Sequence, residues 1–277
     1  PRVNPRVAFQ GERGAFSEEG AQVLFSHEVE TVPCATFELL FSAIKNGRAD
    51  YALSPLENSL AGHVTRCYDL LYESDLWIRA EIVRPIHHCL IGVPGARIDL
   101  LKAVQSHPVA LAQCEAFFVS NPNIKRVVAE DTAGSVREVM ERGDRTVAAI
   151  AGSHAASVYD ATILRSNIED FPENFTRFAL LGPRPAEIAD ANKHSLAVKL
   201  RHESGSLYHA LEPFARHGIS LANLLCRPIK RSPWHYLFFL DFLAAPSDST
   251  QSALQQLHNM AEEVRVLGSY RAAAANI

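Results

Sequence analysis

The sequence predicts an α/β protein with two parts, a two-lobed region over residues 5–183 and a ferredoxin-like βαββαβ module over residues 194–272. Short apolar runs alternate with amphipathic helical segments through the first part, which is typical of α/β folds with mainly parallel sheets. Pro85 separates two extended segments, as expected where a chain crosses between lobes, and the second lobe is expected over about 84–163. After a polar linker at 184–193, the strand and helix signals follow in βαββαβ order.

A glycine-containing loop follows the first predicted strand, Val7-Ala8-Phe9, and contains Gly11 and Gly14. Ser17 is expected to cap the next helix. The backbone N–H groups of such a loop, together with a helix N-terminus, can bind an anion. The loop has neither the third glycine of a dinucleotide fingerprint nor the Lys-Ser/Thr of a P-loop, so both nucleotide-binding motifs are excluded.

The next unit is a helix capped by Thr36 and ended by Gly47, followed by the strand Tyr51–Ser54. This strand is expected to bring Glu57-Asn58-Ser59 to its carboxyl end, just before another helix. Open α/β sheets place ligand-binding groups at such positions. The three polar side chains are therefore candidate ligand contacts.

The predicted second lobe supplies another polar group. The strand Ala103–Gln105 leads into Ser106-His107-Pro108, where proline suits the first turn of a helix, and Gln113 follows one to two turns later. Asp131-Thr132 is expected to cap a further helix. Ser106 and the free N–H groups behind it form a second candidate anion site, with Gln113 able to reach a polar substrate.

Thr176 and Arg177 come directly before the apolar run Phe178-Ala179-Leu180-Leu181, which is predicted to be a buried strand. A hydroxyl and a guanidinium on rigid backbone can supply a proton donor and an anion-binding group. From these residues alone, a turn that enters a strand is the simpler interpretation.

The C-terminal module contains no catalytic constellation, which favours a binding or regulatory role over a purely dimerising one. Its predicted elements are strands at 195–201, 219–227, 235–243 and 264–269 and helices at 207–217 and 250–262.

Charge and hydropathy exclude several partners. The net charge is −4 and no Lys/Arg block is present, so neither nucleic acid nor an anionic membrane is an expected partner. No apolar run approaches the roughly 20 residues of a membrane span, and the first five residues lack a signal-peptide core, so a cytoplasmic protein is expected. The five cysteines are widely spaced without a Cys-x-x-Cys pair, which predicts that most of them are small buried side chains and that no disulfide framework or metal site is formed.

Five motifs, in the same order, resemble those of the prephenate dehydratase family, which includes arogenate dehydratase and carries a C-terminal ACT domain. They are Gly11-Glu12-Arg13-Gly14-Ala15-Phe16-Ser17, Pro55-Leu56-Glu57-Asn58-Ser59, Ser106-His107-Pro108 through Gln113-Cys114, Asp131-Thr132-Ala133 and Asn174-Phe175-Thr176-Arg177-Phe178. The resemblance is collinear from about residue 6 to residue 271. The resemblance implies a type II periplasmic-binding-protein-like fold with a cleft between two lobes. It also implies cofactor-free loss of carbon dioxide and water from prephenate or arogenate.

The resemblance implies roles for individual residues. Thr176 matches the family threonine assigned to proton donation toward the departing hydroxyl. Arg177 is the expected partner of a substrate carboxylate, with the alternative that it holds the loop by pairing with an acidic neighbour. Glu57 is expected either to transfer a proton or to orient a neighbour. The substrate-contacting set is Asn58, Ser59, Ser106, Gln113, Thr132, Ser17 and Phe178, with Phe178 expected to pack under Thr176 and His107 expected to be structural.

The ACT resemblance implies a phenylalanine site formed by Gly205, Ser206, Leu207, Asn223, Leu224, Cys226 and Arg227, and a homodimer or homotetramer. The usual Glu-Ser-Arg-Pro motif is replaced here by Leu225-Cys226-Arg227-Pro228. Losing two polar groups could cost about 1 kcal/mol each, so we expect weakened or altered inhibition by phenylalanine. Ala15 stands where a threonine is usual in the family, a change also found in arogenate-using relatives, so the preferred substrate stays open.

Two other functions deserve comparison. A decarboxylase that keeps the ring hydroxyl should avoid donating a proton to it, and the intact Thr176 argues against that activity. A non-catalytic amino-acid sensor would bind without turnover. It would not need the full set of Glu57, Ser106, Gln113, Thr176 and Arg177.

Overall fold

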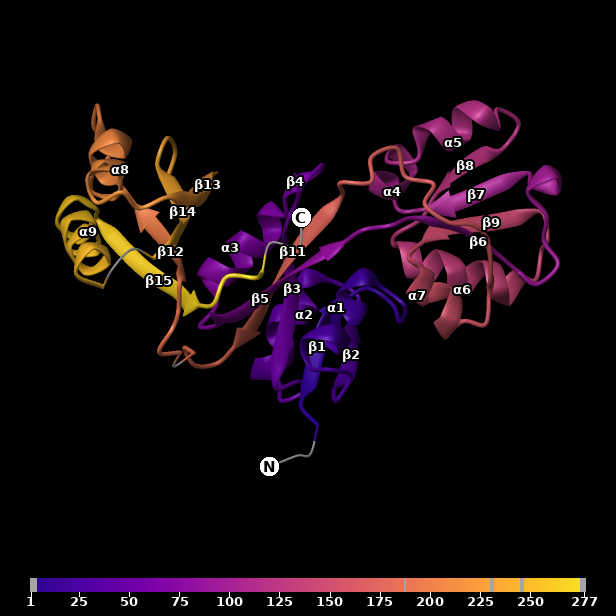
Figure 1. The fold of residues 1–277 in the computed structure, drawn as a ribbon, viewed down its shortest axis with the longest axis horizontal. Coiled ribbons are helices and arrows are strands. Elements are labelled where there is room, and N and C mark those ends of the chain that lie inside the picture. Colours follow the sequence, from indigo (N-terminus) through magenta and orange to yellow (C-terminus); the bar gives the residue numbers. More distant parts are fainter. Residues whose placement is uncertain (1–3, 187, 230–231, 245–246, 275–277) are drawn as a thin grey trace. The chain divides into compact units, whose positions relative to one another are not determined.

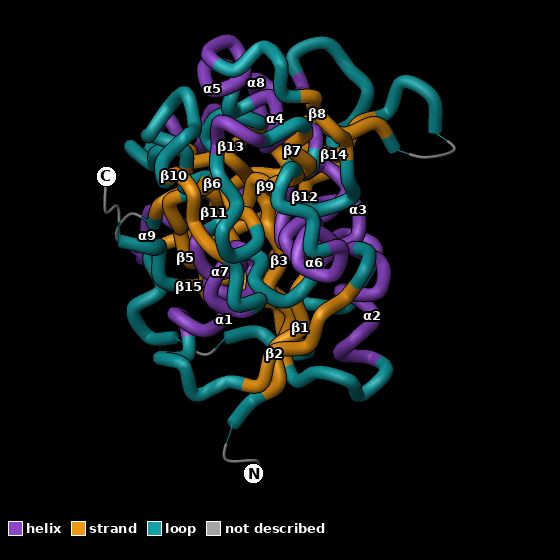
Figure 2. Tube along the Cα trace, turned by 90° about the vertical axis from the view of Figure 1, so that its right-hand side faces the viewer, coloured by secondary structure: helices purple, strands orange, loops and turns teal. Residues whose placement is uncertain are grey.

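The computed structural model describes residues 4–274 except 187, 230–231 and 245–246, so Glu187 of the predicted linker lies outside the described residues. The chain divides into two compact units, one of Pro1–Gly62 with Val83–Phe178 and the other of His63–Ile82 with Ala179–Ile277. Figures 1 and 2 show their helices and strands.

The first sheet has the strand order β2-β1-β3-β11-β5, with the short β4 paired to β3. Its strands and helices are β1 (Arg6–Gln10), α1 (Phe16–Leu24), β2 (Glu30–Cys34), α2 (Phe37–Lys45), β3 (Tyr51–Asn58), β4 (Gly62–His63), α3 (Thr65–Glu73), β5 (Trp77–Pro85) and β11 (Phe175–Gly182). β1 is parallel to both β2 and β3 and places Phe9 opposite Pro33 and Leu53. Phe9 and Leu53 are fully buried, which explains the apolar runs in the sequence.

The second sheet has the order β10-β6-β9-β7-β8. Its elements are β6 (Cys89–Gly92), η1 (Ile98–Leu100), β7 (Ala103–Ser106), α4 (Pro108–Ala112), α5 (Glu115–Ser120), β8 (Lys125–Val128), α6 (Thr132–Arg142), β9 (Val147–Ala151), α7 (Ser153–Val158) and β10 (Thr162–Arg165). Figure 1 shows α4 and α5 on one face of this sheet and α6 and α7 on the other. The helices on each face pack against the sheet in an apolar core. One core includes Phe117 and Ile150, and the other includes Val136 and Ile91.

The predicted helix starts are confirmed in part. Thr36 accepts a hydrogen bond from Leu39 N, Asp131 accepts one from Gly134 N, and His107 accepts one from Val109 N. Ser17 is not a cap, because α1 begins one residue earlier and its N-cap is Ala15.

The strand predictions need three corrections. β3 continues to Asn58, so Glu57 and Asn58 belong to the strand and only Ser59 follows it. The second sheet is mixed, since β6 is antiparallel to both β9 and β10 while β7 is parallel to β8 and β9. The short or weakly apolar elements β2, β4, α5 and β10 were not predicted, because their patterns resemble loops.

The C-terminal module is a four-stranded antiparallel sheet in the order β13-β14-β12-β15. Its elements are β12 (Lys193–Lys199), α8 (Ser206–Arg216), β13 (Leu221–Pro228), β14 (Tyr236–Leu243), α9 (Ser247–Met260) and β15 (Glu263–Tyr270). This is the predicted ferredoxin-like βαββαβ arrangement. Its core packs Phe214 of α8 and Leu257 of α9 against Leu240 and Phe242.

Within the second unit, the module packs on α3 and the first part of β5. Lys193 forms a buried ion pair with Glu81, at 2.8 Å from Nζ to Oε2. Arg227 donates two hydrogen bonds to the Asp69 carboxylate. A Cβ at Gly268 would lie 2.3 Å from a backbone oxygen of β5, so only glycine allows this approach.

Candidate active site

Thr176 and Asn58 lie at the centre of the candidate active site. Thr176 is the second residue of β11, Asn58 is the last residue of β3, and the two strands are neighbours in the sheet. The Asn58 Nδ2 lies 3.0 Å from Thr176 Oγ1 and 2.7 Å from Asn174 Oδ1. An amide nitrogen only donates, so Thr176 Oγ1 accepts here and its own proton remains available for another acceptor.

The loop after β3 fixes the orientation of the Asn58 amide. Asn58 Oδ1 accepts hydrogen bonds from Leu60 N at 3.0 Å and from Ala61 N at 2.8 Å. Two backbone N–H groups can only face an oxygen, so the amide nitrogen must face Thr176.

Ser59 fastens the same loop to the start of β11. Its N–H donates to Phe175 O at 2.8 Å, and its hydroxyl donates to Glu173 O at 3.0 Å. The hydroxyl also accepts from Phe175 N at 2.9 Å. These bonds give Ser59 a part in positioning Thr176, while a direct contact with substrate remains a prediction.

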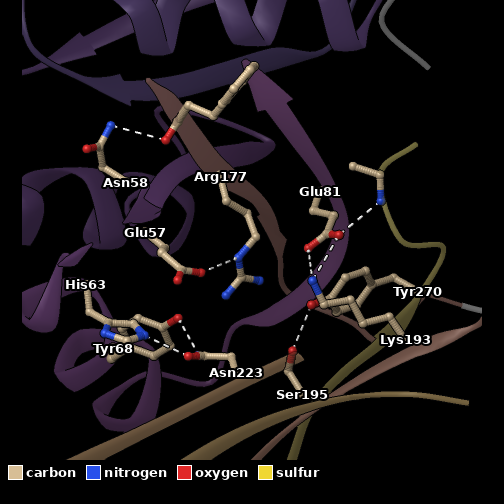
Figure 3. A network of polar contacts seen from close by, with 12 residues as sticks. Glu57, Asn58, His63, Tyr68, Glu81, Arg177, Lys193, Ser195, Asn223 and Tyr270 are labelled. Atoms are coloured by element: carbon tan, nitrogen blue, oxygen red, sulfur yellow. Dashed lines mark hydrogen bonds and ion pairs between the residues drawn. The ribbon is translucent and has the colours of Figure 1, made fainter. Parts of the chain in front are cut away.

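Glu57 and Arg177 form an ion pair on the opposite face of these strands. Adjacent side chains in a strand point to opposite faces, so Glu57 is directed away from Asn58, and Arg177 from Thr176. Arg177 Nε lies 3.5 Å from Glu57 Oε2, and Figure 3 shows this pair apart from Asn58. The guanidinium is thus engaged by a protein carboxylate. This matches the alternative in which Arg177 pairs with an acidic neighbour.

Gln113 joins the cluster around Thr176 from the second lobe. It is the C-cap of α4, and its Oε1 accepts from Asn174 Nδ2 at 3.1 Å. The same oxygen contacts His88 Nε2 at 2.8 Å. Asn174 and His88 are both buried, whereas Gln113 is partly accessible.

Neighbouring groups hold His88 in place. The Phe16 ring meets the imidazole edge-to-face with centroids 5.9 Å apart, and Glu169 accepts from His88 N at 2.9 Å. Burial lowers the pKa of the His88 imidazole, although its contacts with Gln113 and Glu169 act in the opposite direction. The ring is therefore neutral at physiological pH.

The predicted anion site in the first loop is occupied by a side chain of the protein. Glu18 accepts a hydrogen bond from Gly14 N at 2.6 Å and another from Thr31 Oγ1 at 2.7 Å. His154 Nε2 of α7 lies 3.5 Å from Glu18 Oε2 without hydrogen-bond geometry, and this contact is an ion pair when the imidazole is protonated. Gly11 N and Ala15 N bond to backbone oxygens, so these loop N–H groups are not available to a ligand.

Four other predicted substrate contacts lie within secondary structure. Ser106 is fully buried and donates to Ile150 O at 2.6 Å, and Ser17 donates to Gln10 O at 2.9 Å. Thr132 is the first residue of α6. Phe178 is buried in the core, where one ring carbon lies 3.9 Å from the position a Cβ would occupy at Gly20.

The predicted effector residues fall into two groups. Ser206 and Leu207, which follow Gly205, line a pocket of about 150 Å³ that also includes Arg201 and Glu203. On β13, Leu224 and Cys226 are exposed. Asn223 and Arg227 instead bind residues of α3, and Asn223 also contacts His63 of β4.

The Asn223 and Arg227 contacts belong to the second unit. Asn223 donates to Tyr68 Oη at 2.9 Å and its Oδ1 lies 2.6 Å from His63 Nε2, as Figure 3 shows. Arg227 binds Asp69. The sequence contained no signal for this use of the two side chains.

Residues that the sequence did not assign to the site are His88, Asn174 and Glu169. Asn174 appeared only as part of a motif, and His88 was assigned no role in the site. The structure connects them through partners far away in the chain, which no local pattern can reveal.

Among the described residues, no group of three or more His, Cys, Asp or Glu side chains could hold a metal ion. None of the helices in this part of the chain has the length and apolar character of a membrane span.

The chain belongs to the prephenate dehydratase family, whose family model, described as "Prephenate dehydratase", matches residues 7–186. It is 39% identical over 282 residues to arogenate dehydratase/prephenate dehydratase 1 of Arabidopsis thaliana, covering 96% of this chain and 71% of that protein. It is 36% identical to the bifunctional chorismate mutase/prephenate dehydratase of Neisseria gonorrhoeae, covering 96% of this chain and 73% of that protein.

Solved structures agree over almost the whole chain. The prephenate dehydratase of Arthrobacter aurescens, solved in complex with L-Phe, has a TM-score of 0.87 and 29% identity, covering 97% of this chain and 90% of the other. GqqA, described as a novel type of quorum quenching acylase, has a TM-score of 0.88 and 32% identity, covering 97% of this chain and 98% of the other.

Proposed function

We propose that this protein converts prephenate to phenylpyruvate by removing carbon dioxide and water, as a step in phenylalanine biosynthesis. Arogenate, which would give phenylalanine directly, is the alternative substrate. The observation that carries the proposal is the directed contact between Asn58 and Thr176, at 3.0 Å. It leaves the threonine proton for the ring hydroxyl that must depart.

The chemistry needs little more than position and solvent exclusion. Formation of the aromatic ring supplies the driving force, so no cofactor is required. One hydrogen bond to the departing hydroxyl lowers the barrier if the donor is held in place before the reaction. Thr176 has the necessary support, because its partner Asn58 is itself fixed by two backbone N–H groups.

We assign Glu57 and Arg177 to the support of this site. Their ion pair lies on the other face of β3 and β11 from Asn58 and Thr176. Of the two roles considered for Glu57, orientation of its neighbour Asn58 through the strand agrees better with this placement than proton transfer.

Amide hydrolysis, suggested by the similarity to GqqA, is not favoured. A nucleophilic threonine needs a neighbouring base to accept its proton. The Asn58 group that faces Thr176 is a donor and cannot accept one.

The C-terminal module is proposed to be an ACT domain that binds an amino acid and pairs subunits into a homodimer or homotetramer. The pocket beside Ser206 and Leu207 supports a ligand site, since Arg201 and Glu203 could face the carboxylate and the ammonium group. We propose that phenylalanine binds weakly there, because Leu225 and Cys226 replace two polar groups and Arg227 is paired with Asp69. A cytoplasmic location is proposed as well.

A product assay tests the proposal. Purified wild-type protein is given prephenate and arogenate separately, with and without millimolar phenylalanine, and is compared with Thr176→Ser and Thr176→Ala. Turnover by the wild type and the serine variant, with a loss of about 30- to 1,000-fold in kcat for the alanine variant, is expected from losing a transition-state donor. No turnover of either substrate by folded protein would refute the function, and near-normal kcat in Thr176→Ala would remove Thr176 from the chemistry.

A further inference from the structure

Five side chains link the two lobes of the first unit through one uninterrupted hydrogen-bonded chain. In order they are His88, Gln113, Asn174, Asn58 and Thr176, and the successive contacts measure 2.8, 3.1, 2.7 and 3.0 Å. The direction of every bond in this chain follows from the two backbone N–H groups that fix the Asn58 amide.

Asn58 Oδ1 faces two N–H groups, so Asn58 Nδ2 faces Asn174, and the Asn174 atom that it meets must be the oxygen. Asn174 then turns its nitrogen to Gln113, which must answer with Oε1. An oxygen at that position requires a donor from His88, so the proton of this histidine lies on Nε2.

This direction has a chemical result at both ends of the chain. At one end, Thr176 Oγ1 accepts and keeps its proton for the substrate. At the other, Gln113 Oε1 receives two donors, which turns the Gln113 NH₂ group away from both of them, on a side chain that is partly accessible. Two lobes thus each present one donor.

We propose that His88 is a positioning residue of the dehydratase reaction, which sets the Gln113 amide so that its NH₂ group faces the substrate. The inference rests on the proposed function for its kinetic consequence. His88 does not touch the reacting atoms in this arrangement. It acts through Gln113, and Asn174 holds the same oxygen from the other side.

The surroundings of His88 suit this role. A segment after β10 holds the backbones of both partners, because Ile168 N donates to His88 O and Asp170 N donates to Gln113 O. Phe16 covers the imidazole edge-to-face. Within the described part of the chain, His88 Nδ1 has no hydrogen-bond partner and is shielded from solvent, as expected for the unprotonated nitrogen of a neutral ring.

The test compares His88→Gln with His88→Phe. Glutamine can place an N–H donor near the position of Nε2, whereas phenylalanine preserves the ring and its contact with Phe16 without a donor. We expect His88→Phe to lower kcat/KM by about tenfold or more and His88→Gln to stay within about threefold, since one directed hydrogen bond is lost only in the former. In a Gln113→Ala background, His88→Phe should cost almost nothing further.

A second readout does not depend on turnover. In ¹⁵N-histidine NMR spectra of the wild-type protein, the signal that disappears in His88→Phe should belong to a neutral ring protonated at Nε2. Protonation at Nδ1, equal kinetics of the two His88 variants, or full additivity with Gln113→Ala would each overturn the proposal. Absence of turnover in the wild type would refute the proposed function, while the NMR result would still decide the direction of the chain.

Discussion

Replacing Asn58 by aspartate tests the central geometry with the smallest change in shape. The side-chain oxygen that faces Leu60 N and Ala61 N is preserved, so the loop keeps both hydrogen bonds. The Nδ2 donor becomes a carboxylate oxygen that faces Thr176 Oγ1 at the 3.0 Å contact. A carboxylate only accepts, so Thr176 would donate its proton to residue 58 and no longer to the substrate.

The expected loss can be bounded from the structure. Thr176 is the proposed donor to the departing hydroxyl, and a positioned donor of this kind contributes about 2–4 kcal/mol to the transition state. Asn58→Asp should therefore lower kcat by about 30- to 1,000-fold. The substitution should also lower the free energy of unfolding, by less than it raises the activation free energy. The reason is that the new carboxylate also faces Asn174 Oδ1 and Phe175 O, which are acceptors.

A double-mutant cycle with Thr176→Ala separates redirection of the proton from general damage. If Asn58 acts through Thr176, the double variant should be about as slow as Thr176→Ala alone. The assay is initial-rate formation of product, with thermal unfolding and circular dichroism to show that each variant is folded. A near-normal kcat for folded Asn58→Asp, or independent and additive losses in the cycle, would refute the argument.

Two further predictions concern contacts between the lobes of the first unit. Gly152→Ala should lower the free energy of unfolding in urea by about 1–3 kcal/mol, because a Cβ at residue 152 would lie 2.7 Å from the Phe16 ring. The double variant with Phe16→Leu should recover part of that loss. An unchanged unfolding midpoint in Gly152→Ala would contradict the prediction. His154→Gln should destabilise the protein more at pH 5.5 than at pH 8, because the Glu18 carboxylate raises the pKa of His154 in the folded protein. The stabilisation by His154 is complete below the usual histidine pKa near 6.5, and it is lost as the pH rises through the raised pKa of the folded state. Glu18 limits the acid side: burial would raise its pKa, but its hydrogen bonds and His154 hold it below the usual value, so its contribution is lost only as the pH falls through that lowered pKa. Equal losses at the two pH values would show that the His154 charge does not stabilise the fold.

Local chemistry predicted the elements whose signals lie within a few residues. Thr36 and Asp131 correctly predicted the starts of their helices, because a capping oxygen needs only the N–H groups two or three residues ahead. The prediction for Ser17 was wrong because its hydroxyl donates to Gln10 O, seven residues away, and α1 starts without a side-chain cap. The local pattern gave no sign of this distant partner. The antiparallel pairing of β6 with β9 joins residues about 60 positions apart and left no local trace.

The candidate site could be predicted as a set of residues but not as an arrangement. Glu57 and Asn58 are neighbours, as are Thr176 and Arg177, and grouping neighbours into one site ignores the alternation of side chains along a strand. Once β3 is known to extend to Asn58, that alternation alone separates the ion pair from the Asn58–Thr176 pair. The tautomer of His88 is harder to predict from the sequence. It depends on backbone N–H groups after β3, which act on the histidine through three side-chain amides, and this arrangement exists only once both lobes are folded. A site of this kind is specified by connectivity, so changes in the supporting amides should affect catalysis even where they contact no substrate.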